Sequence, residues 1–191
     1  MAGKSAWNPI RLSVIASMIG RHCRGAVIDL GCERGELLGM LDPSRVTSYV
    51  AVDREAAMLA EIPPHAAIPI SRVTASIETF VPTIAEAGAI VCAEALYFVD
   101  HADRVLADMV GRMSRLDAVI VSMVTPIPEK PNWARSVGRT SRELESLGWS
   151  LLERTRVWGE ESGRHISWDI QAFDPRRSLA GARATPATRG K

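Results

Sequence analysis

The chain has 191 residues, of which 47% are hydrophobic and 24% charged, and its formal net charge is +1. This composition is typical of one globular domain and excludes a fully disordered chain. The apolar runs at 89–96 and 118–124 are too short to cross a membrane and have the length of buried strands. No apolar signal core lies near the first residue, and the three cysteines are widely spaced, so we expect a cytoplasmic protein.

The basic residues are unevenly distributed. Residues 176–191 contain five of the 23 Lys and Arg residues and no acid, so the rest of the chain is mildly acidic. An acidic body argues against nucleic-acid binding, which needs a basic face. We expect a single domain over 1–175 and a basic disordered tail over 176–191.

Segments with strand and helix patterns alternate along the chain. An N-terminal helical segment is expected at 1–24, because apolar residues between 9 and 19 recur at helical spacing. Buried strands are predicted at 26–30, 49–52, 68–74, 89–93 and 118–124. Helices are predicted at 36–41, 54–61 and 101–113, the last of them capped by Asp100.

The remaining third of the chain predicts a loop, a helix and a strand pair. A proline-rich loop is expected at 126–139, and Thr140 with Glu143 has the spacing of a capping box for a helix that ends at Gly148. Two strands at 149–158 and 165–173 follow, joined by a polar turn. The alternation predicts an α/β fold with a mainly parallel sheet, and the last strand pair predicts an antiparallel edge.

The pattern with the most chemical content is AVIDLGCERGELLGML at 26–41. A buried strand delivers Asp29 to its C-terminal end, Gly31 and Gly35 flank a tight turn, and a helix begins at once. Glycine in such a turn lets a ligand approach the backbone. Ligands of α/β proteins bind at this edge of the sheet.

A second carboxylate follows the next predicted strand. Asp53 ends VAVD, 24 residues after Asp29. A carboxylate at this place can accept two hydrogen bonds from a ribose diol, although it could also cap the helix that follows. Together the two segments predict a nucleoside-containing ligand across the tips of the first two strands.

These segments resemble the class I S-adenosylmethionine-dependent methyltransferases. Their Asp-x-Gly-x-Gly-x-Gly motif stands here as Asp29-Leu-Gly31-Cys32-Glu33-Arg34-Gly35. AIVCAEALYFVDHADRVL at 89–106 looks most like the nodulation-type N-methyltransferases, and LESLGWSLLERTRV at 144–157 resembles the family's last helix and strand six. The resemblance covers roughly residues 20–174. It implies a Rossmann-like three-layer sandwich with a seven-stranded, mainly parallel sheet and an antiparallel last strand.

The resemblance also implies S-adenosylmethionine as cofactor and roles for particular residues. Asp29, Gly31 and Gly35 would shape the methionine pocket, Asp53 would hold the ribose, and Glu94 would lie beneath the sulfonium. The full set of implied cofactor-binding residues is Asp29, Gly31, Cys32, Glu33, Gly35, Asp53, Arg54, Ser76, Ile77, Glu94 and Ala95. Tyr97 and His101 would face the acceptor as the catalytic candidates.

Two positions depart from the family pattern. Glu33 replaces the middle glycine of the motif, where its side chain would either crowd the cofactor or place a carboxylate near the α-ammonium. Ser76 stands where the family has an acid against the adenine amine. The four histidines show no metal-ligand spacing, and no metal is expected.

The resemblance implies in-line transfer of a methyl group to a nitrogen or oxygen atom. The expected acceptor is a small or medium-sized molecule, such as a natural-product intermediate, a saccharide or a peptide, and the protein is expected to be a monomer or a homodimer. One alternative is a noncatalytic scaffold or regulatory partner with a degenerate cofactor pocket. Another is an RNA or protein methyltransferase that recruits its substrate through the basic tail.

Overall fold

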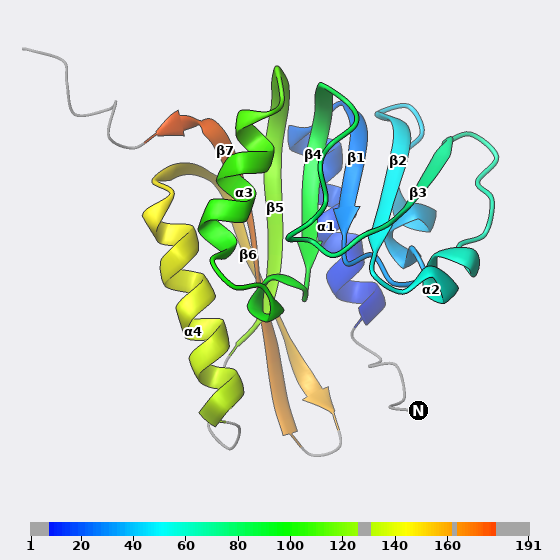
Figure 1. Cartoon of the computed structure of the whole chain (residues 1–191). Helices are drawn as coiled ribbons and strands as arrows, with labels where there is room; N and C mark the ends of the chain where they lie inside the picture. The colour runs from blue at the N-terminus through cyan, green and yellow to red at the C-terminus, as the bar shows by residue number, and fades with distance from the viewer. Residues whose placement is uncertain (1–7, 126–130, 162–163, 179–191) are drawn as a thin grey trace, which may run out of the picture.

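A single seven-stranded sheet runs through the molecule (Figure 1). The structure is a computed structural model and describes residues 8–125, 131–161 and 164–178. The strand order is β3-β2-β1-β4-β5-β7-β6. The strands are β1 Gly25–Leu30, β2 Val46–Asp53, β3 Ile70–Thr74, β4 Glu86–Ala93, β5 Arg115–Val124, β6 Trp149–Glu161 and β7 Arg164–Ser178.

Strand directions follow the predicted pattern. The strands from β3 to β5 pair in parallel, whereas β7 is antiparallel to both β5 and β6. The antiparallel strand therefore lies between β5 and β6, and β6 forms the edge of the sheet. The expected seven-stranded, mainly parallel sheet with an antiparallel last strand is confirmed.

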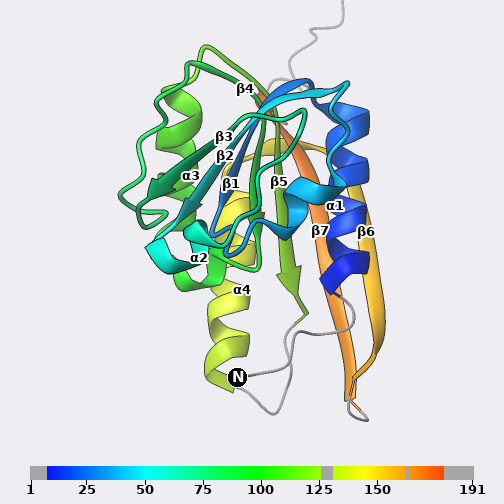
Figure 2. The same cartoon turned by 90° about the vertical axis from the view of Figure 1, so that its right-hand side faces the viewer.

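Helices cover both faces of the sheet (Figure 2). One face carries α1, and the other carries α3 and α4, which makes the expected three layers. The helical elements are α1 Asn8–His22, α2 Ala56–Ala60, α3 Ala102–Gly111 and α4 Pro131–Ser146, with 3₁₀ helices η1 Glu36–Met40 and η2 Leu96–Phe98. Among the described residues, no helix is long and apolar enough to span a membrane.

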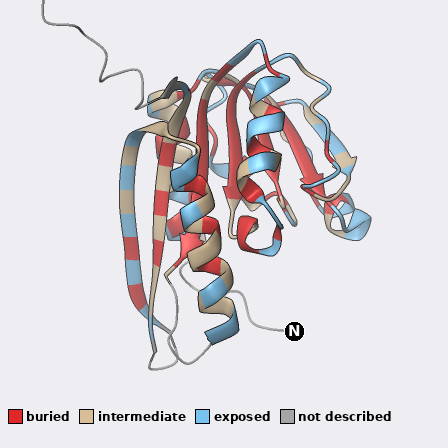
Figure 3. Cartoon of the chain, turned by 60° about the vertical axis from the view of Figure 1, so that its left-hand side comes forward, coloured by how far each residue is buried: buried red, intermediate tan, exposed pale blue. Residues whose placement is uncertain are grey.

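The core lies along the central strands (Figure 3). In β1 every residue after Gly25 is buried, and in β4 the run 87–92 is buried. Strands covered on both faces show such continuous apolar runs rather than alternation. Because β1 has β2 on one side and β4 on the other, the chain reverses its order of strand addition at β1. A ligand-binding crevice is expected there, beyond the carboxyl ends of these strands.

The predicted proline-rich loop at 126–139 is wrong for its second half, because α4 begins at Pro131. Proline suits the first helical position, where its missing N–H costs nothing. Thr140 is therefore not a cap: it is fully buried inside the helix, on a stripe with Val137 and Leu144. Residues 126–130 lie outside the described part of the chain.

The predicted Asp100 cap of the next helix is also wrong. Asp100 Oδ1 instead accepts a hydrogen bond from Arg139 Nη1 at 2.7 Å. The N-cap of α3 is His101, with φ of 55°, and the Ala102 N–H donates to Glu143 Oε2 from α4 at 3.1 Å. Glu143 therefore caps α3, although it belongs to α4, and it does not cap its own helix.

Three other element predictions need adjustment. The helix expected at 36–41 is the 3₁₀ helix η1, whose bonds include Leu38 N–H to Gly35 O at 3.0 Å. Ile10, one of the apolar residues whose spacing predicted the first helix, is 45% exposed, whereas Arg11 is buried. The tail expected at 176–191 overlaps β7, which continues to Ser178, and residues 179–191 lie outside the described chain.

Gly88 in β4 tests the close packing of the central sheet. A Cβ at this position would lie 2.8 Å from the backbone carbonyl atoms of Arg24, and backbone cannot move aside as a flexible side chain can. We expect Gly88→Ala to lower the free energy of unfolding by about 1–3 kcal/mol, measured by urea denaturation. Gly20→Ala is the control, because open space surrounds Gly20 inside α1 and alanine should stabilise the helix by about 0.5–1 kcal/mol. Equal effects of both substitutions would contradict this account.

Candidate functional site

A cavity of about 370 Å³ lies at the carboxyl ends of β1 and β4, where the strand order reverses. Its walls come from α1, the turn after β1, η1, the end of β4 and β7. The lining residues are Asn8, Arg11, Leu12, Asp29, Gly31, Cys32, Glu33, Glu36, Leu37, Ala93, Glu94 and Trp168. Five of the predicted cofactor-binding residues are in this set: Asp29, Gly31, Cys32, Glu33 and Glu94.

Glycine is required at position 31. Its φ is +74°, and a Cβ there would lie 2.8 Å from the Cβ of Ala95. Its N–H donates to the carbonyl of Val52 at 2.8 Å, which ties the turn to β2. The turn after β1 therefore passes close to the end of β4, and this approach brings Ala95 beside the glycine motif.

Glu33, at the position of the missing glycine, adopts the backbone conformation that glycine favours. Its φ is 49°, and its N–H donates to Asp53 Oδ2 at 2.9 Å. Asp53 Oδ1 accepts the N–H of Glu55 at 2.9 Å. Asp53 thus joins the turn after β1 to the segment after β2. It does not cap α2, whose N-cap is Glu55 and whose N-terminus receives no side-chain capping bond.

Asp29 lies buried against the cavity. It is 4% exposed, and its Oδ2 accepts a hydrogen bond from the hydroxyl of Tyr49 in β2. Burial raises the pKa of Asp29 to about 6, while the Tyr49 hydrogen bond and the Arg11 charge act to lower it. The hydrogen bond from Tyr49 and the charge of Arg11 therefore favour the ionised form of Asp29 against the effect of burial.

Glu94 follows β4 and is held by four groups. Its φ is 62°, and it accepts hydrogen bonds from Ser122 Oγ at 3.1 Å and from the Val124 N–H and the Tyr97 hydroxyl at 3.2 Å each. Arg11 Nη1 lies 3.9 Å from Glu94 Oε1. Such strained backbone persists where the surroundings determine it, and it concentrates at functional sites.

Burial and pairing oppose each other at Glu94. Desolvation raises the pKa of the Glu94 carboxyl, and Arg11 and the hydrogen bonds act to lower it. Burial likewise lowers the pKa of Arg11, against the attraction of Glu94. The cavity lining as a whole contains four carboxylic acids and one guanidinium. Its walls therefore favour a ligand with positive charge.

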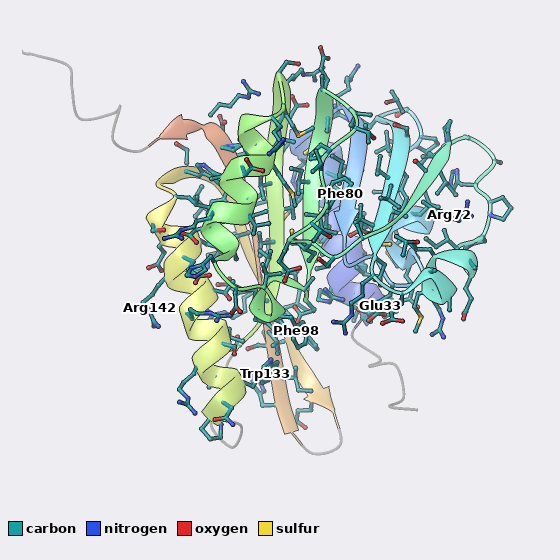
Figure 4. The ribbon with its side chains drawn as sticks, viewed as in Figure 1. Glu33, Arg72, Phe80, Phe98, Trp133 and Arg142 are labelled. Carbon is teal, nitrogen blue, oxygen red and sulfur yellow. The ribbon has the colours of Figure 1, made fainter. Side chains whose placement is uncertain are left out.

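An aromatic group lies beside Glu94 at the same edge of the sheet (Figure 4). The Tyr97 ring centroid is 4.5 Å from that of Phe98 and 5.9 Å from that of Trp133, the latter in an edge-to-face arrangement. Phe98 is 76% exposed. Burial and Glu94 raise the pKa of Tyr97, so its hydroxyl remains a hydrogen-bond donor near neutral pH.

The other six predicted cofactor residues, which include Asp53 and Ala95, are not part of the cavity lining. Gly35, with φ of 65°, precedes η1, and its N–H donates to Cys32 O at 2.8 Å. Ile77 Cδ1 lies 3.9 Å from the position of a Cβ on Gly31. Ser76 interacts with Thr79, and the exposed Arg54 lies 3.7 Å from Glu55. Cys32 is buried, and burial raises the pKa of its thiol, which does not favour a nucleophile.

His101 does not line the cavity, unlike Glu94, the hydrogen-bond partner of Tyr97. It is exposed, and its ring lies with Asp103 and Glu143 in a group whose ligand atoms are all within 4.8 Å of one another. Arg139 Nε lies 3.8 Å from Glu143 Oε1 and supplies positive charge there. Tyr97 does not line the cavity either, but its hydroxyl bonds to Glu94, which does.

Sequence reasoning missed the contribution of α1 and β7. Asn8, Arg11 and Leu12 reach the cavity from α1, and Trp168 reaches it from β7. A charged residue within the apolar face of a helix was the available signal, since buried arginine needs partners. Here Arg11 binds Asn8 Oδ1, and Asn8 Nδ2 donates to Glu36 Oε2 at 2.6 Å. These contacts join α1 to η1.

Glu33 provides a test of the turn after β1. A residue with a side chain destabilises the fold by about 1–2 kcal/mol when its backbone is in the left-handed region. Glycine avoids this strain, but its greater freedom in the unfolded chain cancels part of the gain in stability. We expect Glu33→Gly to stabilise the protein by about 0.5–1 kcal/mol in urea denaturation. Arg34→Gly, one residue away and without a positive φ, should destabilise it by about 0.5–1 kcal/mol. Destabilisation by both substitutions would show that Glu33 is not strained.

Comparison with known proteins bears on the fold. No protein-family model matches the chain, and no curated protein matches it. N-methyltransferase NodS from Bradyrhizobium japonicum WM9 is 16% identical, with a TM-score of 0.66 over 90% of this chain and 98% of that one. A methyltransferase from Geobacter sulfurreducens in complex with S-adenosylhomocysteine is 12% identical, with a TM-score of 0.64 over 88% and 92%.

The methyltransferase domain of a bacterial CtHen1 is 19% identical, with a TM-score of 0.62 over 87% of this chain and 98% of that one. These identities are low, so the likeness concerns the arrangement of the chain in space. The resemblance found in the sequence is confirmed at that level: the chain has the fold of the class I S-adenosylmethionine-dependent methyltransferases.

Proposed function

We propose that the protein is an S-adenosylmethionine-dependent methyltransferase that acts on a nitrogen or oxygen atom of a small or medium-sized acceptor. One observation carries the proposal. The glycine turn after β1 and the strained Glu94 after β4 line one cavity, at the point where ligands bind in this fold.

The residues present fit the cofactor. Gly31 lines the cavity without a side chain, so a ligand can approach the backbone of the turn at this position. The excess of carboxylic acids over guanidinium in the lining suits a ligand that carries a sulfonium and an ammonium. Gly31 and three of the four acids were assigned to cofactor binding by the resemblance, whereas Glu36 and Arg11 were not.

We assign the holding residues by their chemistry. Asp29 and Glu33 would bind the α-ammonium, and Arg11, the one base in the lining, would bind the carboxylate. Asp53 would receive the ribose hydroxyls on the lone pairs that its two backbone bonds leave. The adenine would lie beside Arg54, Ser76 and Ile77, which follow β2 and β3.

When bound, S-adenosylmethionine would supply an activated methyl group, which an acceptor lone pair would take in line as the C–S bond breaks and S-adenosylhomocysteine leaves. The protein's own contribution is alignment and exclusion of water. Glu94, fixed by Ser122 and Val124, keeps its position without reorganisation. Tyr97 is held between Glu94 and Trp133 and would orient the acceptor. His101 receives no role in the transfer, because within the described chain it neither lines the cavity nor hydrogen-bonds to a residue that does.

The acceptor side favours an amine over a hydroxyl. A hydroxyl acceptor needs a base to take its proton, whereas an uncharged amine attacks without one. Glu94 is committed to three hydrogen bonds and to Arg11, so it is poorly placed to serve as that base. The fold is shared with NodS, described as an N-methyltransferase, which supports the same choice.

A noncatalytic scaffold is the alternative, and one observation favours it. Both oxygens of Asp53 already accept backbone hydrogen bonds, and Glu33 occupies a glycine position. A carboxylate whose two oxygens already accept backbone hydrogen bonds does not need a ligand to satisfy it, as expected of a pocket that no longer binds a cofactor. Direct binding of the cofactor distinguishes the two proposals.

Calorimetric titration with S-adenosylmethionine and S-adenosylhomocysteine tests the proposal. We expect both to bind, and Asp53→Asn to weaken them about tenfold or more, because the amide loses an acceptor of hydrogen bonds and a charge. Glu55→Gln is the matched control. It removes an exposed carboxylate two residues away and should leave the affinity unchanged.

Failure of the wild type to bind either ligand, with a normal thermal unfolding transition, would overturn the proposal in favour of the scaffold. Equal losses in Asp53→Asn and Glu55→Gln would instead remove Asp53 from the site.

Phe98 tests the acceptor side. In a screen of amine and hydroxyl acceptors followed by release of S-adenosylhomocysteine, we expect Phe98→Ala to raise the acceptor KM severalfold, since the exposed ring offers an apolar face. The affinity for S-adenosylhomocysteine should not change. Val81→Ala, which truncates another exposed apolar residue, should leave the KM unaltered. An unchanged KM in Phe98→Ala would place acceptor binding elsewhere.

A further inference from the structure

Tyr49 lies outside every motif of the sequence, yet it contacts the cofactor motif. It is in the middle of β2, fully buried, and its hydroxyl donates to Asp29 Oδ2. β1 and β2 pair in parallel with Val27 opposite Tyr49, so the tyrosine side chain extends along the sheet toward the end of β1. Within the described chain, this is the one hydrogen bond that the Asp29 side chain receives.

This bond leaves one oxygen of Asp29 for the cavity. Asp29 lines the cavity, and its Oδ1 has no donor among the described residues. A buried carboxylate with one satisfied oxygen is incomplete, because buried charge needs pairing or hydrogen bonds. A cationic donor in the cavity would complete it.

Other charged groups act on Asp29 from the elements around it. Arg11 on α1 favours the ionised form, while Asp53 at the end of β2 disfavours it. Glu33 lies in the same lining and is also acidic. The neighbouring thiols stay protonated, because burial and Asp29 raise their pKa values; they are Cys32 and Cys92. Arg11 and Tyr49 are therefore the groups that favour a charged Asp29.

Tyr49 is suited to this task. Burial raises its pKa well above the ordinary value, and the adjacent Asp29 raises it further, so the hydroxyl keeps its proton and donates it in the bond. A hydrogen bond to the ionised form favours that form, and bonds to charged groups are the stronger class.

We propose that Tyr49 is a positioning residue that holds Asp29 ionised, with one oxygen turned to the cavity, so that the α-ammonium of the cofactor binds with pH-dependent affinity. The inference rests on the proposed function. It assigns a task to a residue that neither the motif nor the cavity lining contains.

The direction of the pH dependence follows from the carboxyl. The pKa of Asp29 is about 6, so the wild-type affinity for the ammonium should fall as the pH drops through this value. The Tyr49 hydrogen bond lowers the pKa of Asp29, so removing the hydroxyl should raise this pKa. The fall should then begin at a higher pH.

The experiment is calorimetric titration with S-adenosylhomocysteine between about pH 5.5 and about pH 7.5, comparing wild type with Tyr49→Phe. We expect the midpoint of the affinity profile to move up by about one pH unit, and the affinity near pH 6.5 to fall roughly three- to tenfold. 5′-Methylthioadenosine, which lacks the amino-acid part, should bind both proteins equally at every pH.

Asp29→Asn keeps the shape of the side chain but cannot titrate, so its profile for S-adenosylhomocysteine should lose the step near pH 6. This variant also serves if Tyr49→Phe fails to fold, as judged by thermal unfolding. Identical profiles for wild type and the folded Tyr49→Phe, or a retained step in Asp29→Asn, would overturn the inference.

The two proposals fail in different ways. Absence of binding by the wild type to both S-adenosylhomocysteine and 5′-methylthioadenosine would overturn the proposed function. Equal weakening of both ligands by Tyr49→Phe would show general damage to the site and would overturn the positioning role alone.

Discussion

The hydrogen bond from the Glu33 N–H to the Asp53 carboxylate is the contact on which the site depends. It joins the turn after β1 to the end of β2 and holds Glu33 in the left-handed region without a glycine. The same carboxylate orders the segment that leads into α2 through Glu55. With the backbone bond from Gly31 to Val52, it makes the two parallel strands end in one rigid edge, against which Ala95 can pack.

The cavity at this edge of the sheet has more acidic than basic side chains in its lining. Four acids and one arginine line the cavity, and burial raises the pKa of both Asp29 and Glu94. Tyr49 supports Asp29 from the sheet, whereas Glu94 is held by Ser122 and Val124 of β5 and by Arg11 of α1. A cavity that is short of positive charge in the free protein can gain stability from a cationic ligand, because burial makes uncompensated charge costly.

Local patterns predicted the parts of the site that lie next to one another in sequence. The turn at 29–35 and Asp53 could be recognised because glycine positions and strand-end carboxylates are local features. The alternation of strands and helices predicted a mainly parallel sheet, while the order of its strands came from the structure. Arg11, Tyr49 and Trp168 could not be assigned, because each reaches the site through packing between segments far apart in the chain. Pro131 and Thr140 misled for a related reason: a buried helix stripe overrode a capping pattern.

The sequence by itself determined the α/β class, the buried strands and the glycine turn with its two acids. These depend on burial periodicity and on backbone conformations that few residues tolerate. Only the tertiary structure decided which carboxylates face the cavity, which are paired, and that Tyr97 bonds to one of them. Side-chain pairing and desolvation depend on distances between elements, and no local pattern of residues encodes those distances.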